Sequence, residues 1–340
     1  MNTDGSLRTL SSFSSLAVQG ELAGEKWFVT YYRCASYTSN MRLTLHASNQ
    51  VPFSLLTHRY WQSFSYGDDF TRSALNSVGA FTASASPVVS AVSQEVGAIG
   101  GALYQNTLMF AIHKMEQAIS DCQTGNSGGQ YWDEAVAFYV GSIPGASGDD
   151  IGVMQYALAE ERCVEFDTCS ADSDTTTPYK SSVNNAVLTL FKQGKIYGND
   201  LRCTDLDFTK EDLVTQFMIP MIQGVYKYLY LVSVENSEEQ RANLYSFCTA
   251  LLPYVNTFSP SVAATLKANC DLTSSPTIPD GPGVIKAALE SLYSSMRINC
   301  AVMGGFVDGI SSGGITVYHD GMEPCEDVGI KNMVGYLPSK

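Results

Sequence analysis

Apolar side chains recur every three or four residues through most of this chain, a spacing that places them on one face of an α-helix. The clearest case lies within residues 104–123, where the apolar positions include Leu108, Ile112 and Met115. The stretch 213–234 is apolar almost all round, which is typical of a buried central helix, although it contains a proline expected to kink it or to mark its first turn. The pattern predicts that helices make up most of the fold.

Blocks of similar sequence occur in the same order in two parts of the chain. AVAFYVGSIP (135–144) resembles LYSFCTALLP (244–253), and we expect the proline that closes each block to end its helix. NNAVLTLFKQG (184–194) resembles IKAALESLYSS (285–295) in the same way. The shared order indicates a diverged internal duplication. We therefore expect two helical bundle repeats related by a pseudo-two-fold axis.

Alternation of apolar and polar residues, the pattern of a half-buried strand, appears only near the two ends of the chain, at 27–32 and 314–318. The expected fold class is therefore mostly α, with minor β structure in the terminal segments. The predicted organisation is an N-terminal wrapping segment at 1–60, helical repeat A at 61–195, helical repeat B at 196–303 and a C-terminal tail at 304–340.

Composition and charge exclude some classes of partner. The chain has 34 acidic against 20 basic residues, a net charge of -14, and 45% hydrophobic residues, enough for a large core. A chain with this net negative charge is not expected to bind nucleic acid or an anionic membrane by electrostatic attraction. It attracts cations at long range. Because no run of apolar residues reaches the length needed to cross a bilayer, no membrane span is expected.

Nine cysteines are scattered along the chain without any CxxC pair, which disfavours a structural zinc site. In an acidic chain rich in glycine, serine and threonine, they favour disulfides formed in an oxidising compartment. Their pairing cannot be read from the sequence, and the odd number leaves at least one without a partner in the chain. The N-terminal residues lack the apolar core of a signal peptide. Either that signal has been replaced or the protein is not secreted.

The candidate chemistry begins on the helix predicted within 104–123. His113 and Glu116 stand three positions apart there and project from one helix face. Asp133 and Glu134 follow in the segment WDEA, with Tyr139 further along the same predicted helix. Imidazole, carboxylate and phenolate ligands together suit ferric iron better than zinc or copper. An isolated HxxE pair is more often a core histidine beside a solvated glutamate, and the neighbouring WDEA segment is what favours a metal site.

The second repeat offers phenol ligands and a candidate anion site. Tyr226 falls at the position that corresponds to His113, and Tyr230 shares its helix face, so we expect both to reach the same metal from the facing helix. Arg162 is expected to hold an oxyanion such as carbonate against the metal, although a helix salt bridge on a solvated face is equally consistent. His319 lies in a glycine-rich tail and is not expected to be a ligand. No catalytic motif is present, and HKMEQ lacks the HExxH spacing of metalloproteases, so no enzyme is predicted.

These motifs resemble the low-iron-inducible periplasmic, iron-assimilating (Fea-type) proteins of algae and the related phytotransferrins of marine phytoplankton. The likeness rests on YWDEAVAFYVGS (131–142), IHKMEQAI (112–119), YALAEERCVEF (156–166), AALESLYSSMRINCAVMGG (287–305) and MEPC (322–325). The HxxE helix followed by WDEA is also similar, more distantly, to imelysin-type proteins. Phytotransferrins typically add a C-terminal membrane anchor, and this chain ends without one. It is either of the soluble type or an ectodomain.

The resemblance implies an extracellular, periplasmic or cell-surface protein that binds Fe(III), with carbonate or bicarbonate as a synergistic anion, for iron uptake by an alga. A cell-surface or endocytic partner would then take part. A helical cell-surface interaction or adhesion ectodomain without metal is the main alternative, and an imelysin-like peptidase is a third. Visible absorption from tyrosinate bound to iron would separate these classes.

Overall fold

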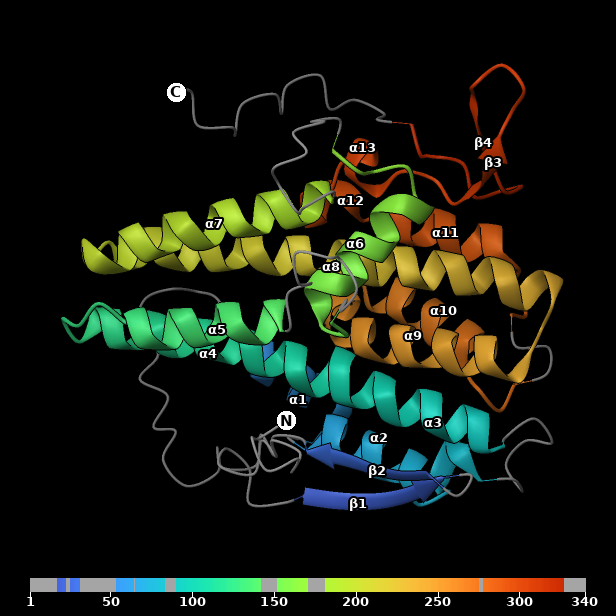
Figure 1. Cartoon of the computed structure of the whole chain (residues 1–340), viewed down its shortest axis with the longest axis horizontal. Coiled ribbons are helices and arrows are strands. Elements are labelled where there is room, and N and C mark those ends of the chain that lie inside the picture. Colours follow the sequence, from blue (N-terminus) through green and yellow to red (C-terminus); the bar gives the residue numbers. More distant parts are fainter. Residues whose placement is uncertain are drawn as a thin grey trace.

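The computed structural model describes residues 17–22, 25–30, 53–63, 65–82, 90–141, 152–170, 181–274 and 278–326. These residues form a mostly α fold, as the periodicity predicts, in which layers of helices pack around a long central one (Figure 1). The helices are α1 (Phe53–Trp61), α2 (Tyr66–Leu75), the 3-10 helix η3 (Gly79–Phe81), α3 (Ala91–Gly100), the π-helix η4 (Gly101–Thr107), α4 (Leu108–Gln123), α5 (Gly129–Val140), α6 (Gln155–Glu165), α7 (Ser182–Asn199), α8 (Cys203–Val234), α9 (Glu238–Phe258), α10 (Pro260–Cys270), α11 (Pro282–Glu290), α12 (Tyr293–Met296) and α13 (Cys300–Met303).

The central helix is α8, and it packs against α4, α6, α7, α9 and α11. In the middle of α8 the apolar side chains point in every direction and most are fully buried, among them Leu213, Phe217 and Ile222. α8 is the one helix of the described residues that is long and apolar enough to cross a membrane, but 67% of its most apolar window is buried inside the protein. Such burial is typical of the core helix of a bundle.

Prolines lie inside two of the long helices. Pro220 is buried within α8, and Pro253 is buried within α9. The prediction that the helix around 244–253 ends at its proline is therefore wrong, because α9 continues to Phe258. A proline removes one backbone hydrogen bond. Buried apolar residues on both sides of Pro253 anchor that helix in the core, and Ser259 starts the next helix as its N-cap.

α3, η4 and α4 follow one another without a break and form the long rod seen in Figure 1. Two glycines at the junction allow close packing. A Cβ atom on Gly100 would lie 2.5 Å from the Cβ of Ser246, and one on Gly101 would lie 2.3 Å from the Oγ1 of Thr71. The π-helical turn that follows holds an extra residue, a geometry found often at functional sites.

Each of the two predicted strands pairs with a second strand that the sequence pattern did not predict. β1 (Ala17–Leu22) pairs with β2 (Glu25–Thr30), and β3 (Val307–Ile310) pairs with β4 (Thr316–Tyr318), both antiparallel. The hairpin β1–β2 lies beside α2 and α3. Both sheets are two-stranded, so the β structure is minor, as predicted.

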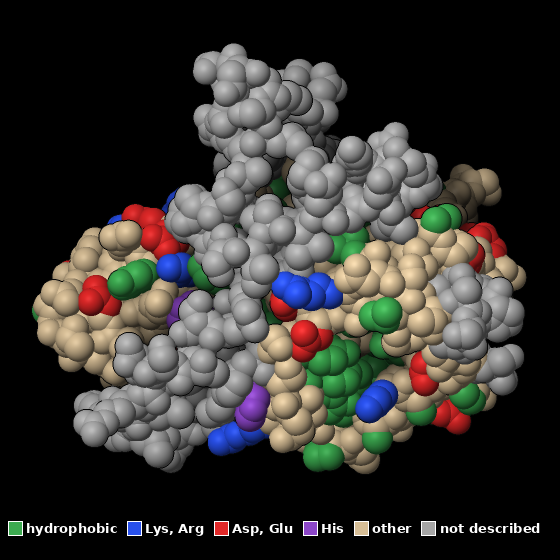
Figure 2. Space-filling view, turned by 90° about the horizontal axis from the view of Figure 1, so that it is seen from below, with side chains coloured by type: hydrophobic (Ala, Val, Ile, Leu, Met, Phe, Trp, Pro, Cys, Tyr) green, Lys and Arg blue, Asp and Glu red, His purple; other side chains and the backbone are tan. Residues whose placement is uncertain are grey.

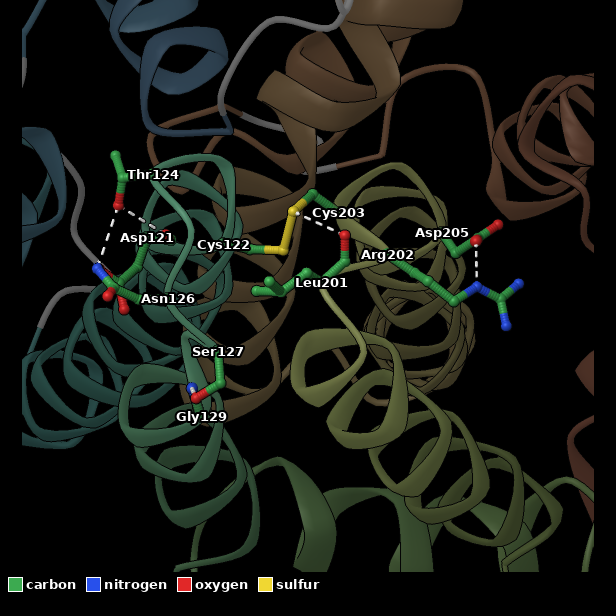
Figure 3. The surroundings of a disulfide bond; sticks show 10 residues. All are labelled: Asp121, Cys122, Thr124, Asn126, Ser127, Gly129, Leu201, Arg202, Cys203 and Asp205. Atoms are coloured by element: carbon green, nitrogen blue, oxygen red, sulfur yellow. Dashed lines mark hydrogen bonds and ion pairs between the residues drawn. A yellow bond between two sulfur atoms is a disulfide. The ribbon is translucent and has the colours of Figure 1, made fainter.

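Four disulfides confirm the expectation from the cysteine pattern: Cys122–Cys203, Cys163–Cys169, Cys248–Cys270 and Cys300–Cys325. Cys34 lies outside the described residues. Figure 3 shows Cys122, near the end of α4, bonded to Cys203 at the start of α8. This bond closes a loop of 81 positions, and such a closure stabilises a fold by about 4 kcal/mol. Four disulfides are compatible with an extracellular or secreted protein.

Candidate functional site

His113 and Glu116 lie together on α4, as their spacing predicts. Both side chains are largely buried, with 12% and 13% of their surface exposed, and His113 Nδ1 lies 4.0 Å from Glu116 Oε2. Burial, helped by the charge of Lys114, lowers the pKa of His113 to about 4. The imidazole is therefore neutral at physiological pH, which is the form that binds metal ions.

A buried lysine of α8 stands near this pair. Lys210 Nζ lies 2.9 Å from Asp207 Oδ1 and 2.8 Å from Glu211 Oε1. Burial acts to lower the pKa of Lys210, but the carboxylates of Glu211, Asp207 and Glu116 outweigh it and raise that pKa. We call His113, Glu116, Asp207, Lys210 and Glu211 the α4–α8 cluster. It holds three acidic groups, one ammonium and a neutral imidazole.

The two acids of the WDEA segment lie on α5 and form ion pairs with lysines. Asp133 is mostly exposed, and its Oδ2 lies 2.6 Å from Lys195 Nζ on α7. Glu134 Oε2 lies 2.7 Å from Lys114 Nζ on α4. Burial acts to raise the pKa of Glu134, but hydrogen bonds from Lys114 and Gln130 lower it. The two acids thus connect α5 to the helices on either side of it.

Two of the predicted phenol ligands, Tyr139 and Tyr226, form hydrogen bonds with other side chains of the core. Tyr139 is fully buried and donates a hydrogen bond of 2.6 Å to Asn184 Oδ1 on α7. The hydroxyls of Tyr226 and Tyr293 lie 2.5 Å apart in the core. Burial raises the pKa of Tyr139 and of Tyr226 well above the ordinary value. Both side chains therefore fasten helices of the core to each other.

Tyr230 is one turn beyond Tyr226 on α8 but contacts a different part of the chain. Its ring stacks on the imidazole of His319 at 4.2 Å between centroids. His319 Nδ1 in turn lies 3.3 Å from Asp308 Oδ1 on β3. Nothing in the sequence indicates that His319 lies beside a predicted ligand, since loop residues have no periodicity from which their neighbours can be predicted.

Arg162 lies on α6 with 2% of its side chain exposed. It forms an ion pair with Glu165, three positions along the same helix, and its Nη2 lies 3.4 Å from Glu161 Oε1. Lys227 of α8 approaches the same acids, with Nζ 2.5 Å from Glu165 Oε1 and 3.6 Å from Glu161 Oε1. The predicted helix salt bridge is present, but the guanidinium is buried and does not lie on a solvated face.

Two tyrosines that the sequence reasoning did not single out adjoin this group. Tyr104 of η4 and Tyr228 of α8 both stack on the ring of Phe247, at 4.4 and 5.7 Å between centroids. Burial raises the pKa of both phenols, and the charge of Arg162 acts against this rise. The position of Tyr228 between two candidate tyrosines, in YKYLY, was the available signal. We call the group the Arg162 cluster: Tyr104, Glu161, Arg162, Glu165, Lys227 and Tyr228.

Among the residues that the structure describes, no group of three or more histidine, cysteine, aspartate and glutamate side chains is arranged to hold a metal ion. His113 and Glu116 form a facing pair, whereas the other predicted metal ligands are engaged with different neighbours. These are Asp133, Glu134, Tyr139, Tyr226 and Tyr230.

The face of the molecule shown in Figure 2 carries a patch of apolar side chains among scattered acidic and basic ones. Between α2, η3 and α9 the described residues line an open hollow of about 120 Å³, and none of the predicted ligands lines it. Its lining consists of Tyr66, Asp69, Phe70, Ser73, Ala80, Phe81 and Tyr245.

Comparison with known proteins adds no relative. No protein-family model matches the chain, and no curated protein or solved structure matches it significantly.

Proposed function

We propose that this protein captures ferric iron outside the cell, at an algal surface or in the periplasm, with carbonate as an assisting anion. The observation that carries the proposal is the pair His113 and Glu116, an imidazole and a carboxylate facing each other within α4. Because the pKa of His113 is low, its imidazole is neutral at physiological pH and one of its two ring nitrogens carries no proton. A metal ion that binds this nitrogen therefore competes with few protons.

The chemistry of the α4–α8 cluster fits a cation. Glu116, Asp207 and Glu211 together exceed the single positive charge of Lys210, so the cluster has an excess of negative charge. His113 and Glu116 would supply one nitrogen and one hard oxygen donor, and a small anion and water the remaining positions around Fe(III). The net charge of the whole chain also favours the approach of cations.

The extracellular setting rests on the disulfides. Four disulfides among the described residues are compatible with an oxidising compartment. Iron capture at a cell surface, followed by transfer to an uptake partner, is the function that joins this compartment to a cation site.

Titration of the metal-free protein with Fe(III), with and without bicarbonate, tests this function. We expect His113→Gln and Glu116→Gln each to weaken iron binding at least about tenfold, since each removes one ligand, a loss near 1.4 kcal/mol. The matched control is His58→Gln, which changes a histidine of α1 that lies outside both clusters. Wild-type iron affinity in both α4 variants would place the site elsewhere.

A second function has its own support. The ion pairs of Asp133 and Glu134 and the core hydrogen bonds of Tyr139 and Tyr226 are what a purely structural role of these residues requires. A helical interaction ectodomain without metal is therefore the competing proposal. It would be favoured if elemental analysis finds no iron bound by the protein after exposure to Fe(III) and bicarbonate.

A further inference from the structure

One edge of the Arg162 guanidinium has no strong acceptor. Its Nη1 side is engaged by Glu165, and Nη2 lies 3.4 Å from Glu161 Oε1, which is long for a charged hydrogen bond. The buried Nε has no hydrogen-bond acceptor among the described residues. Nε–H and an Nη2 N–H point the same way and form the fork that binds two oxygens of one oxyanion.

Further donors lie near the guanidinium. Burial raises the pKa of Tyr228 and of Tyr104, and the nearby guanidinium of Arg162 acts against this rise, so both phenols lie close to it. Both phenols are held in place by stacking on Phe247. Lys227 adds an ammonium whose Nζ lies 5.5 Å from the ring centre of Tyr228. Guanidinium, ammonium and phenol groups are the donors that recognise small oxyanions.

The acids of the cluster differ in how firmly they are held. Glu165 is largely buried and contacts both cations closely, whereas Glu161 is 54% exposed and contacts them at 3.4 and 3.6 Å. The Glu161 carboxylate can therefore turn to water at little cost. A singly charged oxyanion that took its place, such as bicarbonate or dihydrogen phosphate, would leave the net charge of the cluster unchanged, whereas sulfate would add one negative charge.

We propose that the Arg162 cluster binds a small bidentate oxyanion, of the class of bicarbonate, phosphate and sulfate, in the place that the Glu161 carboxylate occupies. The anion bridges Nε and Nη2 of Arg162 and accepts further hydrogen bonds from Tyr228 and Lys227. This inference rests on the carbonate part of the proposed function and names the residues that hold the anion. Because the site requires no metal ion, it is tested in metal-free protein, separately from iron binding.

Calorimetric titration of metal-free protein, with bicarbonate, phosphate and sulfate in turn, tests the proposal. Chloride at equal ionic strength is the reference. We expect saturable binding of at least one oxyanion and none of chloride. Glu161→Gln should tighten that binding about tenfold because it removes the competing carboxylate, and Tyr228→Phe should weaken it about threefold to tenfold because it removes one donor.

Arg162→Lys should abolish the binding, since an ammonium lacks the planar fork. If that variant does not fold, Glu161→Gln and Tyr228→Phe still decide the matter. The matched control is Asp205→Asn, which removes an exposed carboxylate from another arginine ion pair, with Arg202, and should leave oxyanion affinity unchanged. The proposal is overturned by equal responses to chloride and oxyanions, or by a Glu161→Gln variant that binds no more tightly than wild type.

Discussion

Two buried lysines on the same helix have opposite pKa shifts. Lys210 lies in the α4–α8 cluster, where Glu211, Asp207 and Glu116 raise its pKa in spite of burial. The pKa of Lys227 is lowered, first by burial and then by the neighbouring charge of Arg162, against the pull of Glu161. The side chains are of one type and both are largely buried, so the difference comes from the neighbours.

The charge balance of the two clusters explains what each can attract. Around Lys210, three carboxylates share one ammonium, and the surplus negative charge favours a cation. Around Lys227, Arg162 supplies a second positive charge, and two carboxylates match two cations. One of these carboxylates is loosely held, which is the basis of our proposal that an external anion replaces it. The two lysines differ because the sign of the neighbouring charges, more than burial alone, decides in which direction the pKa of a buried lysine shifts.

The largest expected effect concerns the contribution of the Arg162 cluster to the stability of the fold. Arg162→Met should lower the free energy of unfolding by about 3 kcal/mol or more, because it breaks the buried ion pair with Glu165 and leaves that carboxylate with Lys227 as its one cationic neighbour in the Arg162 cluster. Urea unfolding measures this loss. Arg202→Met, which breaks an exposed pair with Asp205, should cost less than about 1 kcal/mol. Equal losses in the two variants would show that the buried pairing of Arg162 is not special.

A second prediction uses pH to probe the α4–α8 cluster. Because the folded-state pKa of His113 is about 4, and an unfolded histidine titrates near 6.5, the unfolded state takes up this proton first as pH falls. The contribution of His113 to stability is therefore complete above pH ~6.5 and is lost as pH falls toward 4, by up to about 3 kcal/mol.

Urea unfolding between pH 7 and pH 4 detects this loss as the difference between wild type and His113→Gln. The variant should have a shallower decline of stability over that range, since it has no imidazole to protonate. Parallel pH profiles for the two proteins would mean that the imidazole is not held neutral in the folded state.

The smallest expected effect concerns the ammonium group of Lys210. Lys210→Met removes the ammonium that competes with a bound cation near Glu116, so ferric iron should bind about tenfold more tightly, a gain near 1.4 kcal/mol. Titration with Fe(III) at constant pH and bicarbonate measures it. Lys192→Met, on the exposed face of α7, should leave the affinity unchanged. A weaker affinity in Lys210→Met would mean that the lysine supports the site and does not compete with the metal.

Much of the fold could be predicted from the sequence because helical periodicity is a local property. The burial of Leu108, Ile112 and Met115 on α4 follows from their spacing, and the all-round burial of the middle of α8 follows from its continuous apolar stretch. The presence of disulfides followed from composition. Pro253 was misjudged because local propensity favours a helix end, while tertiary packing of the residues around it keeps α9 intact. The duplication with its pseudo-two-fold axis stays a prediction from the sequence.

The candidate site was determined by the sequence only within single helices. The spacing of His113 and Glu116 places them on one face of α4 whatever surrounds that helix. Which residues of different helices meet was decided by the tertiary structure alone. Asp133 pairs with Lys195, and Glu165 with Lys227, each across a separation of 62 positions. It likewise gathered Tyr104, Tyr228 and Arg162 from three helices. Helix period fixes the direction of a side chain about its own axis, whereas helix packing fixes what that side chain faces.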